Sequence, residues 1–247
     1  MDTLFIFTLF EGLDRKGPGS DACTNRMFNI LSPPPDSRIL DIGCGAGSQT
    51  LTLARQCRDC HITAVDIHQP YLDTLRKRAD AEGTGGRIVT VCRSMDDLPF
   101  APEYFDVVWA EGSIFVIGFE KGLSYWKKFL KTGGSLALTE MVWFTENPPD
   151  EIATFMEEEY PLITSIAGCK QMIEKSGYDL VASFSLPSEA WWNEYYTPLQ
   201  IKLAGMEEEY AENQDALAVI DMTWREIEQF RKYSDYYGYQ AFLLKKI

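Results

Sequence analysis

Histidine is scarce in this sequence, which has only His61 and His68 among its 247 residues. Nucleophilic catalysis of the Ser/His/Asp kind needs a histidine base beside a hydroxyl and a carboxylate. We find no such set, and the sequence therefore gives no sign of that chemistry.

Basic residues are also few, since 23 Lys and Arg face 37 Asp and Glu and leave a net charge of −14. A field of that sign repels phosphate backbones, so we do not expect nucleic acid as a partner. The two short basic runs, Arg76–Arg78 and Lys127–Lys128, are better explained as solvated faces of surface helices.

No second pair of cysteines follows Cys57 and Cys60, whose CxxC spacing alone does not make a zinc site. We predict no metal centre, and we expect these two cysteines to pack or to be exposed by chance. Cys44 is expected to act as a small apolar residue. A reduced, cytoplasmic location fits this cysteine usage best.

Long apolar runs are missing as well. The start, residues 1–10, is apolar but too short to span a bilayer and carries no basic leader. We expect it to pack as a helix or strand over the domain, and we predict no membrane span.

The most informative segment that is present is Arg38–Gly47. It reads as a short buried strand followed at once by a loop with Gly43, Gly45 and Gly47. Glycines spaced in this way allow a ligand to touch the backbone. Asp66 follows at the end of the next apolar run, which is the layout for holding a nucleoside and its ribose hydroxyls.

The glycine pattern differs from that of dinucleotide-binding loops. Ser48 stands directly after Gly47, and Asp41 lies inside the strand, two residues before the first glycine. An acid there would repel a pyrophosphate. It suits a ligand with a cationic amino group and a sulfonium.

These residues resemble the class I S-adenosylmethionine (SAM)-dependent methyltransferases. Five segments match in order between about residues 38 and 144: Asp41–Gly47, Val65–Ile67, Ser94–Phe100, Phe105–Trp109 and Leu130–Gly134. The third segment is similar to the small-molecule branch related to ubiquinone and menaquinone methyltransferases. The resemblance implies SAM as cofactor and S-adenosyl-L-homocysteine as its product.

The resemblance also implies roles for single residues. Gly43, Gly45 and Gly47 would approach the methionine and ribose portions, Asp41 the amino group, directly or through water, and Asp66 the ribose hydroxyls. Asp66 could instead cap the following helix. Ile67 would cover one adenine face. The contact to the adenine edge is shared among Ser94, Met95 and Asp96.

Further candidates surround this predicted site. Glu111 follows a strand and would contact the amino end of the donor or act as a general base, unless it is a solvated loop acid. Glu140 is a weaker candidate of the same kind, and His68 could lie near the adenine. The segment containing Lys16 and Gly19 forms either a lid over the donor or a plain connector.

The predicted fold is α/β, a doubly wound, mostly parallel seven-stranded sheet of the Rossmann-like methyltransferase type with helical insertions. Residues 1–35 would form an N-terminal helical lid and residues 36–247 the methyltransferase domain, with an insertion at about 188–232. The family resemblance implies a final strand inserted antiparallel. Strands are predicted at 38–43, 61–67, 87–92, 105–110, 134–144, 178–186 and near the end, and helices at 21–31, 48–56, 70–82, 121–131, 150–160, 165–176 and within 198–232.

The predicted function is methyl transfer from SAM to a small molecule, mainly through proximity and orientation. The aromatic residues at 191–196, with Tyr236, Tyr237 and Tyr239, would either line the acceptor pocket or pack the inserted helices. A SAM-binding regulator and a nicotinamide-dependent dehydrogenase are the alternatives. The acceptor atom and a homodimer are left open.

Overall fold

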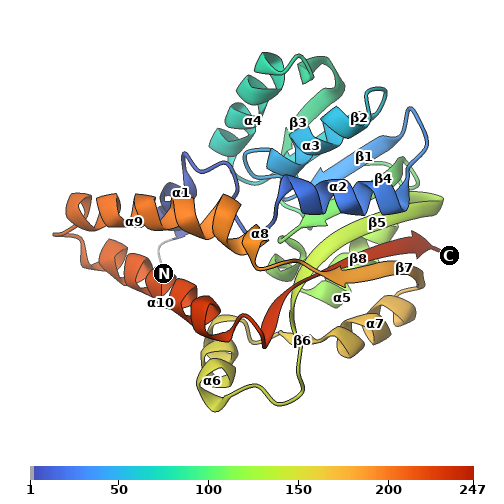
Figure 1. The fold of residues 1–247 in the computed structure, drawn as a ribbon. Helices are drawn as coiled ribbons and strands as arrows, with labels where there is room; N and C mark the ends of the chain where they lie inside the picture. Colours follow the sequence, from blue (N-terminus) through green and yellow to red (C-terminus); the bar gives the residue numbers. More distant parts are fainter. Residues whose placement is uncertain (1–2) are drawn as a thin grey trace.

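The protein is organised around one mixed sheet, seen in a computed structural model that describes residues 3–247 (Figure 1). Its main path runs in the order β3-β2-β1-β4-β5-β8-β7, and a short β6 pairs with β5. The strands are β1 (Arg38–Ile42), β2 (His61–Asp66), β3 (Ile88–Cys92), β4 (Phe105–Glu111), β5 (Leu130–Trp143), β6 (Thr164–Ser165), β7 (Tyr178–Ser185) and β8 (Tyr237–Lys246).

β8 lies antiparallel between β5 and β7, whereas β1 to β5 pair in parallel. The doubly wound sheet and the antiparallel final strand are therefore confirmed. The chain reverses its direction of travel across the sheet between β3 and β4, which places a crevice at the carboxyl ends of β1 and β4, where open α/β folds bind ligands.

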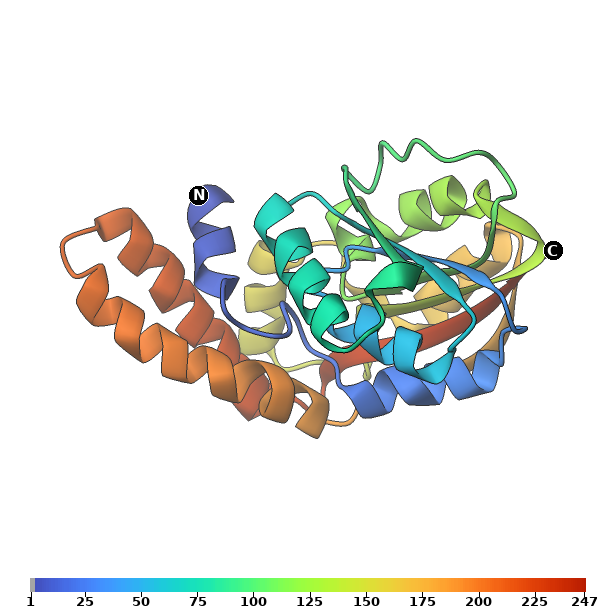
Figure 2. The same cartoon turned by 90° about the horizontal axis from the view of Figure 1, so that it is seen from above.

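Helices cover both faces of the sheet (Figure 2). α2, α3 and α4 lie on one face, and α5 and α7 lie on the other. The longer helices are α1 (Thr3–Phe10), α2 (Asp21–Leu31), α3 (Ser48–Gln56), α4 (Gln69–Ala81), α5 (Phe119–Lys127), α6 (Asp150–Glu159), α7 (Ile166–Lys175), α9 (Thr197–Glu209) and α10 (Gln214–Tyr233). Shorter turns are η1 (Gly85–Arg87), η2 (Ile114–Val116), α8 (Glu189–Trp191) and η3 (Trp192–Tyr196).

The apolar run of β1 explains the layered core. Ile39 packs into the same cluster as Leu53 of α3, while Leu40 packs with Leu123 of α5 on the opposite face. Successive side chains of a strand point to opposite faces, so a strand covered on both sides needs apolar residues at nearly every position. This burial fixes where β1 ends and where the glycine loop begins.

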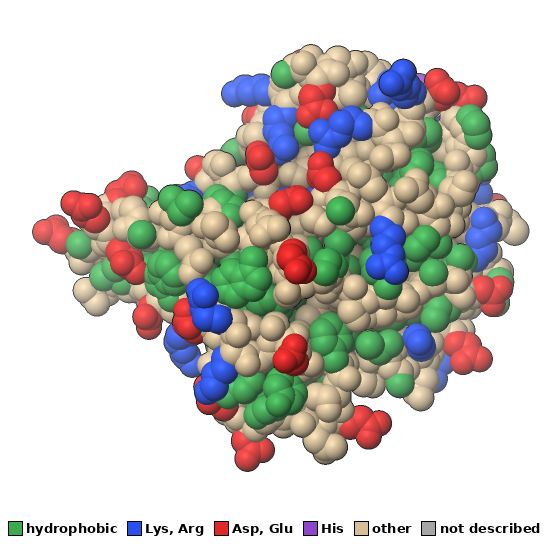
Figure 3. Space-filling model, in the orientation of Figure 1, with side chains coloured by type: hydrophobic (Ala, Val, Ile, Leu, Met, Phe, Trp, Pro, Cys, Tyr) green, Lys and Arg blue, Asp and Glu red, His purple; other side chains and the backbone are tan. Residues whose placement is uncertain are grey.

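The helical insertion projects away from the sheet. α9 and α10 run side by side as an antiparallel pair (Figures 1 and 2). The sequence predicted one helical region at 198–232, but the chain turns at residues 210–213, and the Asn213 side chain caps α10 by accepting from Ala216 N at 3.1 Å. Acidic side chains gather at the outer end of this pair (Figure 3); the sequence places Glu207, Glu208, Glu209 and Glu212 there.

Two other boundaries differ from the prediction. The helix predicted at 121–131 begins at Phe119 and ends at Lys127, because the chain enters β5 at Leu130, which pairs with Phe105. A strand of two residues, β6, was not predicted, since it is too short for a periodic pattern. The stretch between β3 and β4 contains no helix, in line with the brief connection expected there.

Cys57 and Cys60 form a disulfide. The sequence predicted unbonded cysteines in a reducing compartment, and the pairing corrects that prediction for these two residues. The bond joins the end of α3 to the start of β2, where the two cysteines face each other across a two-residue turn. Cys44, which was expected to behave as a small apolar residue, is buried and free.

Within residues 3–247, no helix combines the length and the apolar character needed to cross a membrane.

Candidate functional site

The glycine loop after β1 requires glycine for steric and conformational reasons. Gly43, Gly45 and Gly47 have φ angles of +72°, +54° and +88°, a region that side chains disfavour. A Cβ atom on Gly47 would overlap the Leu75 side chain, and one on Gly43 would lie 2.5 Å from Ser113 Cβ. The conformation and the packing of this loop therefore favour glycine at all three positions.

Asp66 ends β2 beside this loop, as its spacing predicted. Its Oδ2 accepts from Gly45 N and its Oδ1 from His68 N, both at 2.9 Å. Burial raises the pKa of Asp66, although these two amides oppose the shift. Because His68 is the N-cap residue of α4, Asp66 also supports the start of that helix. The carboxylate thus ties the glycine loop to the next strand.

Asp41 lies behind the loop and not at its surface. Its side chain is buried and accepts from the Thr50 hydroxyl and from Gln49 Nε2, both on α3. Burial raises the pKa of Asp41 to about 7. Gln49, and not Asp41, lines the adjoining cavity.

A small cavity of about 70 Å³ lies against the glycine loop. Gly43 and Gly45 form one side, Glu111 at the end of β4 and the following Gly112 form another, and residues 14–18 of the N-terminal segment close it. The loop, the last acid of β4 and the predicted lid segment therefore meet at the carboxyl ends of β1 and β4.

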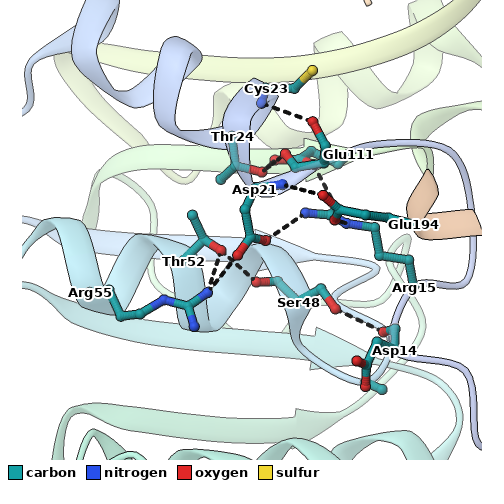
Figure 4. Close-up of polar contacts among 12 residues, drawn as sticks. Asp14, Arg15, Asp21, Cys23, Thr24, Ser48, Thr52, Arg55, Glu111 and Glu194 are labelled. Carbon is teal, nitrogen blue, oxygen red and sulfur yellow. Dashed lines mark hydrogen bonds and ion pairs between the residues drawn. The ribbon is translucent and has the colours of Figure 1, made fainter. Parts of the chain in front are cut away.

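Glu111 is anchored by three donors (Figure 4). Its Oε1 accepts from the Thr24 hydroxyl at 2.7 Å and from Trp109 Nε1 at 2.8 Å, and its Oε2 accepts from Arg15 Nη1 at 3.4 Å. Only 4% of the side chain is exposed. This side chain therefore lies buried at the cavity wall, with both carboxyl oxygens hydrogen-bonded.

Arg15 joins this carboxylate to the insertion (Figure 4). Its Nε donates to Glu194 at 2.7 Å and its Nη2 to Asp21 at 3.0 Å. Burial alone would lower the pKa of Arg15, but Glu111, Glu194 and Asp21 together raise it above its ordinary value. Sequence reasoning missed Arg15 and Glu194; only the position of Arg15 next to Lys16 offered a signal.

Lys16 covers the glycine loop without aiming its charge at the cavity. Its Nζ donates to the Phe10 and Leu13 carbonyls at 2.6 and 2.5 Å, and burial lowers its pKa to about 8. Its Cγ would lie 3.0 Å from a Cβ on Gly45. Gly19 donates its backbone N–H to Ala190 O at 3.0 Å, which fixes the far end of the segment.

The predicted adenine contacts lie at the next strand ends. Ile67 is 62% exposed, and its carbonyl accepts from Cys92 Sγ at 3.4 Å. Ser94 donates to Asp96 at 2.6 Å, and Lys121 donates to the other Asp96 oxygen at 3.2 Å.

Asp96 is charged and held by two partners, and the neighbouring Met95 reaches the glycine loop. The hydrogen bond from Ser94 and the ion pair with Lys121 lower the pKa of Asp96, which is therefore held as an anion. Met95 reaches the glycine loop, since a Cβ on Gly43 would lie 3.6 Å from its Cε.

A second, larger cavity of about 270 Å³ adjoins the first. The two share Lys16, Gly17, Pro18 and Gly112 as walls. The predicted aromatic cluster reaches it in part, because Trp192 and Tyr236 do not line it, whereas five other members do: Trp191, Tyr195, Tyr196, Tyr237 and Tyr239.

The two weaker candidates lie outside both cavities. Glu140 is buried on β5, where its Oε1 accepts from Tyr160 at 2.6 Å and its Oε2 has no partner among the described residues. Burial raises the pKa of Glu140 to about 7. The His68 ring stacks on Phe7 with centroids 4.2 Å apart.

Within residues 3–247, no group of three or more His, Cys, Asp or Glu side chains is placed to hold a metal ion.

The fold and the glycine loop with its acid define an α/β domain of the nucleoside-binding class. A family model described as a methyltransferase domain matches residues 39–134, which run from β1 into β5. The match covers less than half of the chain, and over this segment the protein is similar to methyltransferase domains.

Two curated methyltransferases are similar to part of this chain. Methyltransferase GfsG of Streptomyces halstedii is 24% identical over 69% of this chain and 63% of its own length. The ubiquinone/menaquinone C-methyltransferase UbiE of a Ruegeria species (strain TM1040) is 31% identical over 50% and 49%. The chain thus spans less than two thirds of either relative.

Among solved structures, a SAM-dependent methyltransferase from Geobacter sulfurreducens in complex with S-adenosyl-L-homocysteine superposes with a TM-score of 0.83 at 19% identity, over 98% of both chains. This likeness confirms the Rossmann-like fold, including the helical insertion.

Proposed function

We propose that this protein transfers the methyl group of SAM to a small-molecule acceptor and releases S-adenosyl-L-homocysteine. The observation that carries the proposal is the pair of adjoining cavities. One lies against a glycine loop and the other is walled by aromatic rings, and they meet at Gly112 and at the segment Lys16–Pro18. A donor whose amino end lies in the first cavity would therefore face an acceptor in the second.

The residues fit an adenosyl donor. Gly43 and Gly45 border the small cavity without side chains, so their backbone would approach the methionine and ribose portions. Asp66 would accept from the ribose hydroxyls. The exposed Ile67 would cover one adenine face, and Ser94, Met95 and Asp96 would flank the other edge.

The amino end of the donor would meet the small cavity. Gln49 lines it and donates a hydrogen bond to Asp41, so Asp41 would act indirectly, by positioning the Gln49 side chain. Glu111 borders the same cavity. Its three hydrogen-bond donors hold the carboxyl group in place. This favours a role in attracting the donor's ammonium group, and it disfavours the general-base role also predicted for this residue.

The bound donor supplies a methyl group already activated by the positive charge on sulfur. The protein then needs to hold the acceptor in line with the methyl group and to exclude water. Residues 14–18 close the small cavity and also border the larger one, so residues 1–35 would act as the lid of a methyltransferase domain formed by residues 36–247. The helical insertion would complete the acceptor pocket.

The remaining parts of the proposal concern partners and location. We propose a small molecule and not a nucleic acid as the acceptor, because acidic side chains crowd the exposed end of the insertion (Figure 3). A cytoplasmic location and a homodimer stay predictions.

The test is turnover of labelled SAM with a metabolite extract, followed by mass identification of the methylated product. Label transfer by the wild type that is lost with Asp66→Ala supports the proposal. Stoichiometric SAM binding without transfer to any acceptor would instead identify a non-catalytic binder. Tight NAD binding without SAM binding would refute the assignment of SAM as the cofactor.

A further inference from the structure

The larger cavity combines aromatic rings with carboxylates. Five tyrosines line it, and Glu226 of α10 lies in the same wall. Tyr160 already donates to Glu140, and the other four are Tyr195, Tyr196, Tyr237 and Tyr239. Glu226 accepts a hydrogen bond from the Tyr196 hydroxyl at 2.8 Å. Burial raises the pKa of all four tyrosines, and the nearby Glu226 carboxylate raises it further.

Burial raises the pKa of Glu226, and no free cation among the described lining residues opposes that shift. Among the described residues that line the cavity, Lys16 is the one basic side chain, and its ammonium is bound to the Phe10 and Leu13 carbonyls. A second acid, Glu159, lies in the same wall. A carboxylate, phosphate or thiolate acceptor would therefore meet like charge without a counter-ion.

A hydroxyl in the wall also lacks a partner. The Tyr237 Oη atom is buried and has no hydrogen-bond partner in the described part of the chain. Buried hydroxyls are nearly always paired, so this one points to a ligand with a polar group. The cation–ring contacts found within residues 3–247 all involve other rings, so none of these four tyrosines already holds a cation of the protein.

We propose that this cavity is an aromatic cage for a small amine, held as a cation by Glu226 and by the faces of Tyr195, Tyr196, Tyr237 and Tyr239. Aromatic faces attract ammonium groups, and the attraction is strongest where water is excluded. The cavity volume of about 270 Å³ restricts the acceptor to a small molecule.

This inference rests on the proposed function and names its acceptor class. A protonated amine first gives its N–H proton to the Glu226 carboxylate. The nitrogen lone pair then forms the N–CH₃ bond as the S–CH₃ bond of SAM breaks and its electron pair stays on sulfur. The positive charge moves from sulfur to nitrogen, and the cage stabilises the resulting ammonium.

The experiment is calorimetry on the full chain saturated with S-adenosyl-L-homocysteine. The probes are choline and its uncharged isostere 3,3-dimethylbutan-1-ol, with dimethylamine and isopropanol as a smaller pair. We expect each cation to bind at least about tenfold tighter than its neutral partner. Equal or weaker binding of both cations, or no heat from either, would overturn the inference.

Two variants locate the effect. Glu226→Gln should remove most of the cation preference, whereas Glu228→Gln, an exposed acid two residues farther along α10 that pairs with Arg231, should leave it unchanged. An undiminished cation preference in a folded Glu226→Gln variant contradicts the proposal.

The wild-type comparison decides the question even where Glu226→Gln fails to fold. Binding of S-adenosyl-L-homocysteine in the first titration tests the proposed function separately. Its absence would sink that function, whereas its presence without a cation preference would sink only the amine assignment.

Discussion

Removing the charge of Glu111 should weaken the link between the N-terminal segment and the sheet. Glu111→Gln keeps an oxygen for the Thr24 and Trp109 donors at 2.7 and 2.8 Å, but it replaces the carboxylate that faces Arg15 at 3.4 Å. Both side chains of this pair are at most 5% exposed. Breaking a buried ion pair costs about 3–5 kcal/mol when one charge is left alone.

Arg15 is not left alone in this variant, because Glu194 at 2.7 Å and Asp21 at 3.0 Å remain. We therefore place the loss of unfolding free energy below that range, at about 2 kcal/mol. Urea unfolding followed by tryptophan fluorescence measures it. The matched control is Glu194→Gln, whose side chain is 39% exposed and whose loss should stay below about 1 kcal/mol. A loss for Glu111→Gln no larger than that of the control would refute the reasoning.

Two further predictions concern the glycine loop and a buried acid. Gly47→Ala should lower the free energy of unfolding by about 2–4 kcal/mol, because its Cβ would meet Leu75 at a φ of +88°. The control Gly83→Ala, at a φ of +69° in open space, should cost about 1 kcal/mol in the same urea titration. Equal losses would contradict the steric argument. For Glu140, whose pKa is raised to about 7 from an ordinary 4.5, the folded state binds the extra proton, so its contribution to stability falls as pH rises from about 4.5 to 7. Glu140→Gln, which still accepts from Tyr160, should flatten that fall by up to about 3 kcal/mol, and an unchanged pH profile of the unfolding free energy would exclude the shift.

The sheet could be predicted from the sequence because its signals are local. The apolar run of β1 and the glycines after it fix the strand–loop–helix unit, and Ser20 caps α2 by accepting from Cys23 N at 3.2 Å. These features act within a few residues of one another. Longer-range pairing decides the start of β5 at Leu130, which no local pattern marks.

The site could be predicted only in part for the same reason. The glycines and Asp66 belong to one contiguous motif. Arg15 and Glu194 are separated by 179 residues, and their ion pair arises only when the insertion folds against the N-terminal segment. The burial of Asp41 also depends on a helix, since it is Thr50 and Gln49 of α3 that engage its carboxylate.

The aromatic pocket shows where composition alone falls short. A run of aromatic residues at 191–196 predicts either a pocket or a packed interface. The π-helical turn η3 directs Tyr195 and Tyr196 to the cavity, while Trp192 does not line it. Glu226, which completes that wall from α10, stands in an ordinary amphipathic helix and carries no sequence signal of its own.

The central claim is that the glycine loop and Asp66 together hold an adenosyl donor, and calorimetric titration with S-adenosyl-L-homocysteine tests it most directly. We expect stoichiometric binding to the wild type and an affinity about ten- to a hundredfold weaker for Asp66→Ala, because charged hydrogen bonds to the ribose are lost. Asp73→Ala, an exposed acid on α4, serves as the control and should bind as the wild type does. Absence of binding to the wild type, or an unchanged affinity in a folded Asp66→Ala variant, would contradict the account.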